Sequence, residues 1–229
     1  MLGYLIWQEE GRPAVTLERR TIGGAVFLVL DARGRERRLR RRIDRAVEEM
    51  ARRGVRRWVV PENWPEAWRR SVAPVPVYPL RRALLSQMLD CLCTRQSLDL
   101  RSETVLLSAP RADEPVRRAA ELLSRRCRYL VLQMEGAEGL YQDLWRRFGL
   151  SPGMGQGGKP RLQVSFGEPL EGIPALLLGP DCQRRQTVIY GLTACPEAPF
   201  PGEQTAAALW SAGALSPEEI RVRAVEFHA

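Results

Sequence analysis

Residues 104–149 constrain the fold most, because two apolar runs alternate there with two helical patterns. Residues 104–108 and 129–132 are short and largely apolar, whereas 116–123 and 140–148 carry apolar side chains at helical spacing. Strands that are apolar on both faces and alternate with helices are typical of a parallel sheet covered on both sides. We therefore predict an α/β fold, with a binding crevice at the carboxyl ends of the strands.

The rest of the chain adds elements of the same kind. We expect strands at 4–7, 14–19, 25–30, 55–60, 162–166, 174–178, 187–190 and 221–227, and helices at 36–53, 80–93 and 204–212. Alternation in 14–19 indicates an antiparallel strand with one wet face. The polar segment 94–102 is the candidate junction, so we predict two linked lobes, 1–99 and 100–229, with antiparallel strands added near the termini.

The unit at 104–149 resembles the start of a Rossmann-like dinucleotide-binding domain. Such a domain follows the substrate domain in shikimate-dehydrogenase-like and glutamyl-tRNA-reductase-like proteins. The order of strand, turn, helix and strand is similar, and Glu135 stands where these families hold the ribose hydroxyl. The resemblance implies a Rossmann-like C-terminal lobe with a mostly parallel sheet flanked by helices. It also implies that Ser108, Arg111, Asp113 and Glu135 surround the place of the cofactor, with Arg111 on phosphate.

The turn after the first strand departs from that family pattern. The residues from Ser108 to Asp113 replace the glycines that let the backbone approach the pyrophosphate. Pro110 and Pro115 have no N–H to offer, and Asp113 would repel phosphate although it makes a good helix N-cap. We therefore predict a scaffold that has lost dinucleotide binding. The alternative is a reductase-like enzyme that depends on NAD(P) or another nucleotide and uses Arg111 and Glu135.

A second glycine-rich segment, 153–159, has the spacing of a phosphate loop, G-x4-G-K. That loop needs a preceding strand, a following helix and a Ser or Thr for magnesium. Here a helix precedes, a strand follows, and Pro160 occupies the Ser/Thr position. We interpret the segment as a loop in which Lys159, the only lysine of the chain, is a candidate anion contact.

The net charge of +8 comes almost entirely from arginine. A guanidinium binds phosphate or carboxylate in a bidentate way, which makes a nucleic acid a candidate partner through the region from Arg33 to Arg57. An acidic protein is a further candidate partner. A GC-rich coding background also accounts for the bias. On helix 36–53, Asp44, Glu48 and Glu49 stand three or four residues from arginines, so internal ion pairs on a solvated face are the first interpretation.

Three tryptophans lie close to arginines in the next segment. Trp58, Trp64 and Trp68 could stack on single-stranded bases. Trp64 and Trp68 stand one helical turn apart, however, and this spacing favours core packing.

Other catalytic chemistry has little support in the sequence. His228 is the only histidine and stands next to the last residue, so serine or cysteine nucleophiles lack a base. An odd number of cysteines without a secretion signal favours reduced thiols, and the absence of a C-x2-C pair argues against a zinc site. Cys182 is either a thiolate or a small packed residue. Four carboxylates near strand ends are acid–base candidates or helix caps: Asp31, Glu62, Glu135 and Asp181.

The expected helix at 80–93 is apolar over a wide arc, which requires burial on more than one side. It could bridge two halves of the chain or form a homo-oligomer contact. No run approaches the roughly 18 apolar residues of a membrane span, and the N-terminus does not resemble a signal peptide. The sequence therefore predicts a cytoplasmic, non-enzymatic protein that binds a partner or self-associates.

Overall fold

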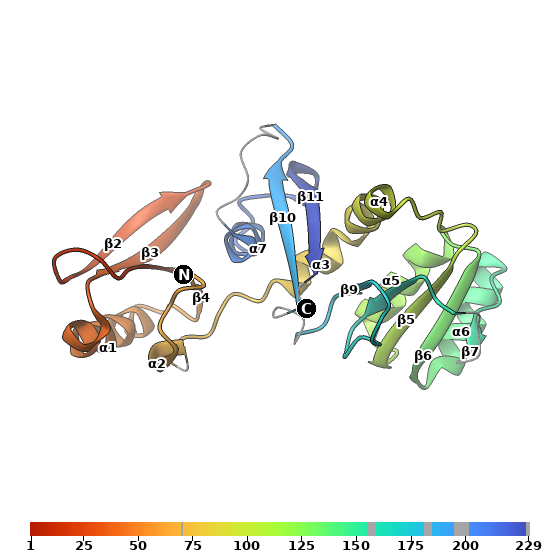
Figure 1. Ribbon diagram of the computed structural model, residues 1–229, viewed down its shortest axis with the longest axis horizontal. Coiled ribbons are helices and arrows are strands. Elements are labelled where there is room, and N and C mark those ends of the chain that lie inside the picture. Colours follow the sequence, from red (N-terminus) through yellow and green to blue (C-terminus); the bar gives the residue numbers. More distant parts are fainter. Residues whose placement is uncertain (70, 155–158, 181–184, 195–201, 228–229) are drawn as a thin grey trace. The chain divides into compact units, whose positions relative to one another are not determined.

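The chain forms two compact units in a computed structural model (Figure 1), which describes residues 1–69, 71–154, 159–180, 185–194 and 202–227. Unit 1 comprises Met1–Pro76 and Phe200–Glu219, and unit 2 comprises Val77–Pro199 and Ile220–Ala229. Residues near 99, where the sequence places the junction, lie inside unit 2. The division by contacts is therefore different from the predicted lobes 1–99 and 100–229.

Unit 1 is built on a mixed four-stranded sheet with the order β2-β3-β1-β4. Its strands are β1 (Leu2–Gln8), β2 (Ala14–Ile22), β3 (Ala25–Arg33) and β4 (Arg57–Val59). β1 pairs in parallel with β3 and β4, whereas β2 pairs antiparallel with β3. The predicted strands are confirmed, although the one expected at 55–60 is shorter.

The core of unit 1 forms between this sheet and α1 (Glu36–Arg52). The apolar stripe of α1 is buried as predicted, through Leu39, Ile43, Val47 and Met50. Gly54, at φ +84°, ends the helix in the left-handed conformation that lets Val55 N–H donate to the Met50 carbonyl at 3.0 Å. Unit 1 also contains α2 (Glu66–Arg69), α7 (Glu203–Ser211) and the short 3-10 turn η2 (Pro217–Glu219).

Unit 2 contains a five-stranded sheet in which every neighbouring pair is parallel, with the order β7-β6-β5-β8-β9. The strands are β5 (Thr104–Arg111), β6 (Tyr129–Glu135), β7 (Gly153–Met154), β8 (Leu162–Ser165) and β9 (Ala175–Leu177), and the helices between them are α5 (Glu114–Ser124) and α6 (Ala137–Phe148). The chain adds strands outward from β5 and then returns to its other side. This order is that of a doubly wound sheet, and the direction changes between β5 and β8. The predicted parallel sheet flanked by helices is confirmed, and it is compatible with a Rossmann-like fold.

The remaining elements of unit 2 are α3 (Tyr78–Ala83), α4 (Leu85–Gln96) and the antiparallel pair β10 (Gln186–Leu192) and β11 (Ile220–Phe227). The prediction of one helix at 80–93 is wrong, because the backbone departs from helical geometry at Leu84. The two pieces serve different partners. α3 directs Arg81 to β9 and β10, whereas α4 follows β11, where Gln87 exchanges hydrogen bonds with Ile220 and Val222.

The wide apolar arc predicted on this segment is covered within the chain. At most 2% of each of six side chains is exposed: Leu80, Leu84, Leu85, Met88, Leu89 and Leu92. None of the described helices is long and apolar enough to cross a membrane.

Candidate functional site

The switch point between β5 and β8 is where a doubly wound fold holds its ligand, and the structure places Ser108 there. Ser108 is buried and forms hydrogen bonds with two residues of β8. Its hydroxyl lies 3.1 Å from Ser165 Oγ and accepts from Gln163 Nε2 at 2.7 Å. The Gln163 Oε1 atom in turn accepts from Leu170 N–H at 2.9 Å. The polar groups of this cluster, Ser108–Gln163–Ser165, are therefore engaged with one another and not directed at a ligand.

The end of β5 differs from the predicted turn at 109–113. The strand continues to Arg111, with a change of register between Ser108 and Arg111. Such a bulge tolerates Pro110, which cannot donate to a strand ladder. The proline ring lies beside Gly167 after β8, since a Cβ added there would be 3.6 Å from Pro110 Cδ. The chain thus places a rigid ring at the position where a dinucleotide-binding fold has glycines.

The N-terminus of α5 is capped by its own chain. Asp113 is the N-cap residue, and its carboxylate accepts from Val116 N–H at 3.2 Å. The Asp113 N–H donates to the Arg111 carbonyl at 3.0 Å, and Pro115 has no N–H to donate. The sequence prediction that Asp113 is a good N-cap is confirmed. A second carboxylate, Glu114, occupies the first turn, and both side chains are exposed.

Arg111 and Glu135 stand opposite each other at the carboxyl ends of β5 and β6, as register partners. Both are exposed. The structure therefore brings together the two residues that the resemblance assigns to phosphate and ribose. No ion pair joins them in the described part of the chain, so both remain available to solutes.

Lys159 is exposed and stands just before the segment that leads to β8. The helix α6 and the two-residue strand β7 precede the glycine-rich segment, and β8 follows it without a helix. Residues 155–158 lie outside the described residues. The context confirms that the G-x4-G-K spacing is not followed by the helix of a phosphate loop.

The most buried charged side chain among the described residues is Arg81, which is fully inaccessible to solvent. Its guanidinium donates to the Leu177 carbonyl at 3.3 Å, to Gln186 Oε1 at 3.2 Å and to the Gln186 carbonyl at 2.7 Å. Sequence reasoning missed this residue, because it interpreted the helix by its apolar arc. The arginine links α3 to β9 and β10, which is a structural role.

The neighbouring Arg82 lies over two aromatic rings. Its guanidinium carbon is 4.8 Å from the ring centroid of Tyr78 and 5.0 Å from that of Phe166, and its Nε donates to the Leu178 carbonyl at 2.9 Å. Phe166 and Leu178 directly follow β8 and β9. The Arg82 guanidinium, which lies close to the switch point, is therefore engaged by aromatic rings and a carbonyl of the protein itself.

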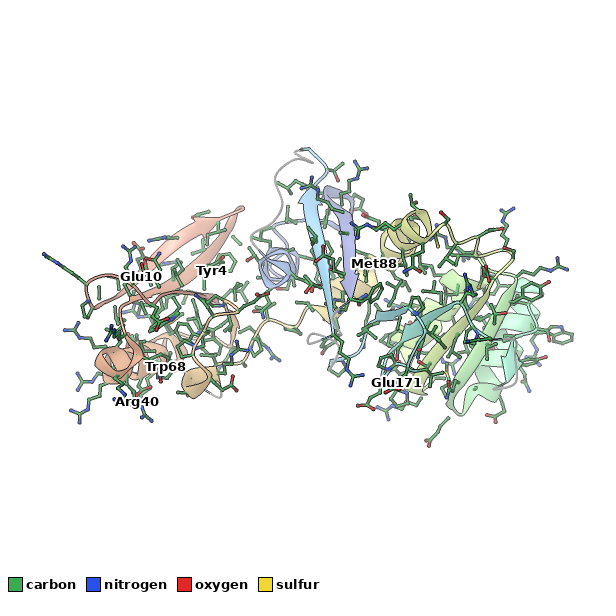
Figure 2. All side chains as sticks on the ribbon, in the orientation of Figure 1. Tyr4, Glu10, Arg40, Trp68, Met88 and Glu171 are labelled. Atoms are coloured by element: carbon green, nitrogen blue, oxygen red, sulfur yellow. The ribbon has the colours of Figure 1, made fainter. Side chains whose placement is uncertain are left out.

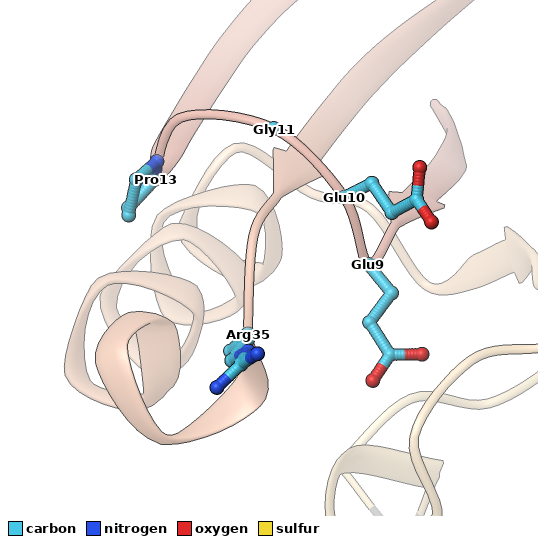
Figure 3. Close-up of a pocket in the computed structure, with 5 residues that line it drawn as sticks. All are labelled: Glu9, Glu10, Gly11, Pro13 and Arg35. Carbon is cyan, nitrogen blue, oxygen red and sulfur yellow. The ribbon is translucent and has the colours of Figure 1, made fainter.

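Unit 1 has an open cavity of about 690 Å³ beside the loop from β1 to β2 (Figure 3). Glu9, Glu10, Gly11 and Pro13 line it from that loop, and Arg35 lines it from the residue before α1. The three charged side chains are exposed.

The arginines of α1 differ in how they are paired. Glu49 forms ion pairs with Arg52 at 3.0 Å and with Arg53 at 2.7 Å, which confirms one of the predicted sources of internal pairs. Among the described residues, Asp44 and Glu48 form none. The first half of α1 therefore carries exposed arginines without a carboxylate partner in the described chain: Arg37, Arg40, Arg41, Arg42 and Arg45. Figure 2 shows side chains of α1, Arg40 among them, reaching outward from unit 1.

The tryptophans near these arginines are part of the core. Trp58, Trp64 and Trp68 are 2–5% exposed. The centroids of Trp64 and Trp68 lie 5.8 Å apart, and each ring also contacts Trp7, at 6.1 and 5.7 Å. Packing is confirmed, and the tryptophans offer no exposed face for stacking on bases.

Three further predictions concern thiols and carboxylates. Cys91, Cys93 and Cys127 are free thiols, and burial raises the pKa of Cys127 to about 12, which keeps that thiol protonated and unreactive. No cluster of potential metal ligands occurs among the described residues. Asp31 is buried and accepts from Arg33 Nη2 at 2.9 Å, so it is a structural acid.

Glu62 is exposed on the segment between β4 and α2. Asp181, Cys182, Cys195 and His228 lie outside the described residues. Comparison with known proteins adds no family: no protein-family model matches the chain, and no curated protein matches it.

Proposed function

We propose that this protein is a cytoplasmic, non-enzymatic binding protein whose Rossmann-like unit 2 is a scaffold without a dinucleotide site. The observation that carries this proposal is the self-capped N-terminus of α5. A dinucleotide fold receives its pyrophosphate on free backbone N–H groups at this position. Free thiols at Cys91, Cys93 and Cys127 suit a reducing compartment.

Two independent features support the loss of phosphate binding at α5. The N–H groups of Asp113 and Val116 already donate within the chain, and Pro115 has none. The carboxylates of Asp113 and Glu114 stand at the same helix start, where they repel a second anion. At this helix start a diphosphate would therefore find the N–H groups of Asp113 and Val116 already engaged, and the two carboxylates would repel it.

Ligand-induced thermal stabilisation tests this proposal. NAD, NADP, ATP and GTP, each at 1 mM in separate samples, should leave the Tm of the protein unchanged. A ligand present at roughly 100 times its Kd stabilises the native state by about 2.7 kcal/mol, which raises Tm by roughly 5–10 °C in a chain of this size. A rise of several degrees with one of these nucleotides would contradict the proposal.

The second candidate function is a nucleotide-dependent, reductase-like enzyme. Its specific support is that Arg111 and Glu135 are register partners at the ends of β5 and β6, where both side chains are exposed. If this function is correct, R111Q and E135Q abolish the nucleotide-induced rise in Tm. The matched control R146Q/E171Q changes one exposed arginine in the last turn of α6 and one exposed glutamate before β9, and it retains the rise.

Self-association through residues 80–93 stays a prediction, and the structure narrows how it would occur. The apolar side chains of this segment are buried in the single chain, so a second copy would contact only its partly exposed and exposed residues. Light scattering across a concentration series measures the mass directly. A mass of 25.9 kDa at every concentration would exclude this form of binding.

A further inference from the structure

We infer that the outer face of α1 binds the phosphate backbone of double-stranded nucleic acid, through a row formed by Arg37, Arg41 and Arg45. These residues stand at i, i+4 and i+8, so they share one side of the helix. The buried stripe of Leu39, Ile43 and Val47 occupies a different side. This inference deepens the proposed binding function by naming the class of partner.

The row is charged and exposed, and its guanidinium groups form no ion pair with the described residues. In the described part of the chain, none of the three guanidinium groups takes part in an ion pair, whereas Arg52 and Arg53 on the same helix share Glu49. Placing cations near the N-terminal end of a helix also opposes its macrodipole. Asp44 and Glu48 stand on the same side of the helix, three residues after Arg41 and Arg45, but neither forms an ion pair among the described residues. The guanidinium groups of the row therefore stay free to contact an external polyanion.

The dimensions of the row suit a duplex backbone. Eight residues of helix separate Arg37 from Arg45, which corresponds to about 12 Å. One strand of a duplex presents a phosphate about every 3.4 Å along its axis, so the row meets roughly three or four of them. Guanidinium groups hold phosphate oxygens in a bidentate way, and a helix face of this kind reads no base sequence.

Other anionic partners fit this face less well. Single strands require exposed aromatic rings for stacking, but α1 has no aromatic residue and the nearby Trp58, Trp64 and Trp68 are buried. Insertion into an anionic membrane requires apolar side chains beside the cations, and those of α1 are in the core. A protein interface requires an apolar centre, which the arginine row does not provide.

Fluorescence anisotropy with a labelled 20-base-pair duplex tests the inference on the whole chain. Wild-type protein should bind in the micromolar range at 50 mM salt, and R37Q/R41Q/R45Q should bind much more weakly with a shallower salt dependence. Each phosphate contact contributes about 0.9 to the slope of log K against log salt. Between 50 and 200 mM salt, the affinity of the wild type should therefore fall roughly 40-fold more than that of the variant.

Two further variants separate the row from net charge and from misfolding. R101Q/R146Q/R221Q removes three exposed arginines of unit 2 and should bind like the wild type. R37K/R41K/R45K retains the charges and should recover most of the binding. Equal loss in the unit 2 control, or no binding by the wild type, would overturn the inference.

Competition experiments identify the class of partner. The duplex should compete better than a single strand of equal length, a polyglutamate peptide or phosphatidylserine vesicles. Equal or better competition by any of these three would overturn the assignment to duplex backbone. None of these measurements reports on the strand ends of unit 2, so the outcome is independent of the nucleotide experiments above.

Discussion

Polar groups at the strand ends of unit 2 are bonded within the chain, whereas the row of arginines on the outer face of α1 in unit 1 has no internal partner among the described residues. Around β5 and β8, Ser108, Gln163 and Ser165 bond to one another, and Asp113 caps the adjacent helix. On α1, the row Arg37–Arg41–Arg45 has no carboxylate partner in the described chain. Buried polar groups must be satisfied internally, whereas exposed charges need not be. The difference supports the proposals that the fold-typical ligand position is structural and that anions bind at α1.

The largest expected effect is on the internally satisfied side of this comparison. R81A should lower the free energy of unfolding by more than about 3 kcal/mol, because the substitution leaves buried acceptors on Leu177 and Gln186 without their donor. Urea unfolding measures the change. The exposed R101A is the control and should stay within about 0.5 kcal/mol of the wild type. A similar small change in R81A would show that Arg81 does not hold α3 to β9 and β10.

Gln163 is expected to have the next largest effect. Q163L should destabilise the protein by about 1–3 kcal/mol, since it leaves the Leu170 N–H without its acceptor and removes one partner of Ser108. Urea unfolding measures this loss of stability. The control is Q133L, a substitution at an exposed residue of β6. If the cluster were a vacant ligand site, Q163L would change stability little, and the comparison would fail at this point.

Capping by Asp113 should contribute less. D113A should cost about 0.5–2 kcal/mol, and D113N should retain most of the stability because an amide oxygen still accepts from Val116 N–H. Thermal unfolding followed by circular dichroism measures both. Equal stability of D113A and the wild type would mean that the carboxylate is not needed for capping.

The smallest effect has the opposite sign and lies on α1. R37E should raise the free energy of unfolding by about 0.3–1 kcal/mol, because it places a favourable charge in the first turn of the helix. The control R52E lies in the last turn, loses the pair with Glu49 and should be less stable than the wild type. Loss of stability in R37E would show that the arginine row has an internal structural role.

Much of the fold followed from local patterns. The parallel sheet of unit 2 was predictable because its strands are apolar on both faces and alternate with amphipathic helices. The break at Leu84 was not predictable, because the apolar arc is continuous across it and does not indicate that α3 and α4 pack against different strands. The extension of β5 to Arg111 depends on a bulge, which periodicity does not reveal.

The candidate sites were predictable only in part. The N-cap role of Asp113 is a local property and was visible in the sequence. The cluster Ser108–Gln163–Ser165 joins residues more than 50 positions apart, and the contacts of Arg81 reach residues about 100 positions away. Such contacts depend on strand order, which a single sequence does not display. The unpaired state of Arg37, Arg41 and Arg45 required the geometry of side chains as well.

Amide chemical shifts of the 15N-labelled protein, titrated separately with NADP and with a 20-base-pair duplex, compare both regions in one sample. The duplex should shift amides of residues 37–45 and leave residues 108–117 unchanged, while NADP at 1 mM should shift neither set. Saturable shifts by NADP at Ser108, Arg111 and Glu135, with α1 unaffected by the duplex, would contradict the assignment of both regions.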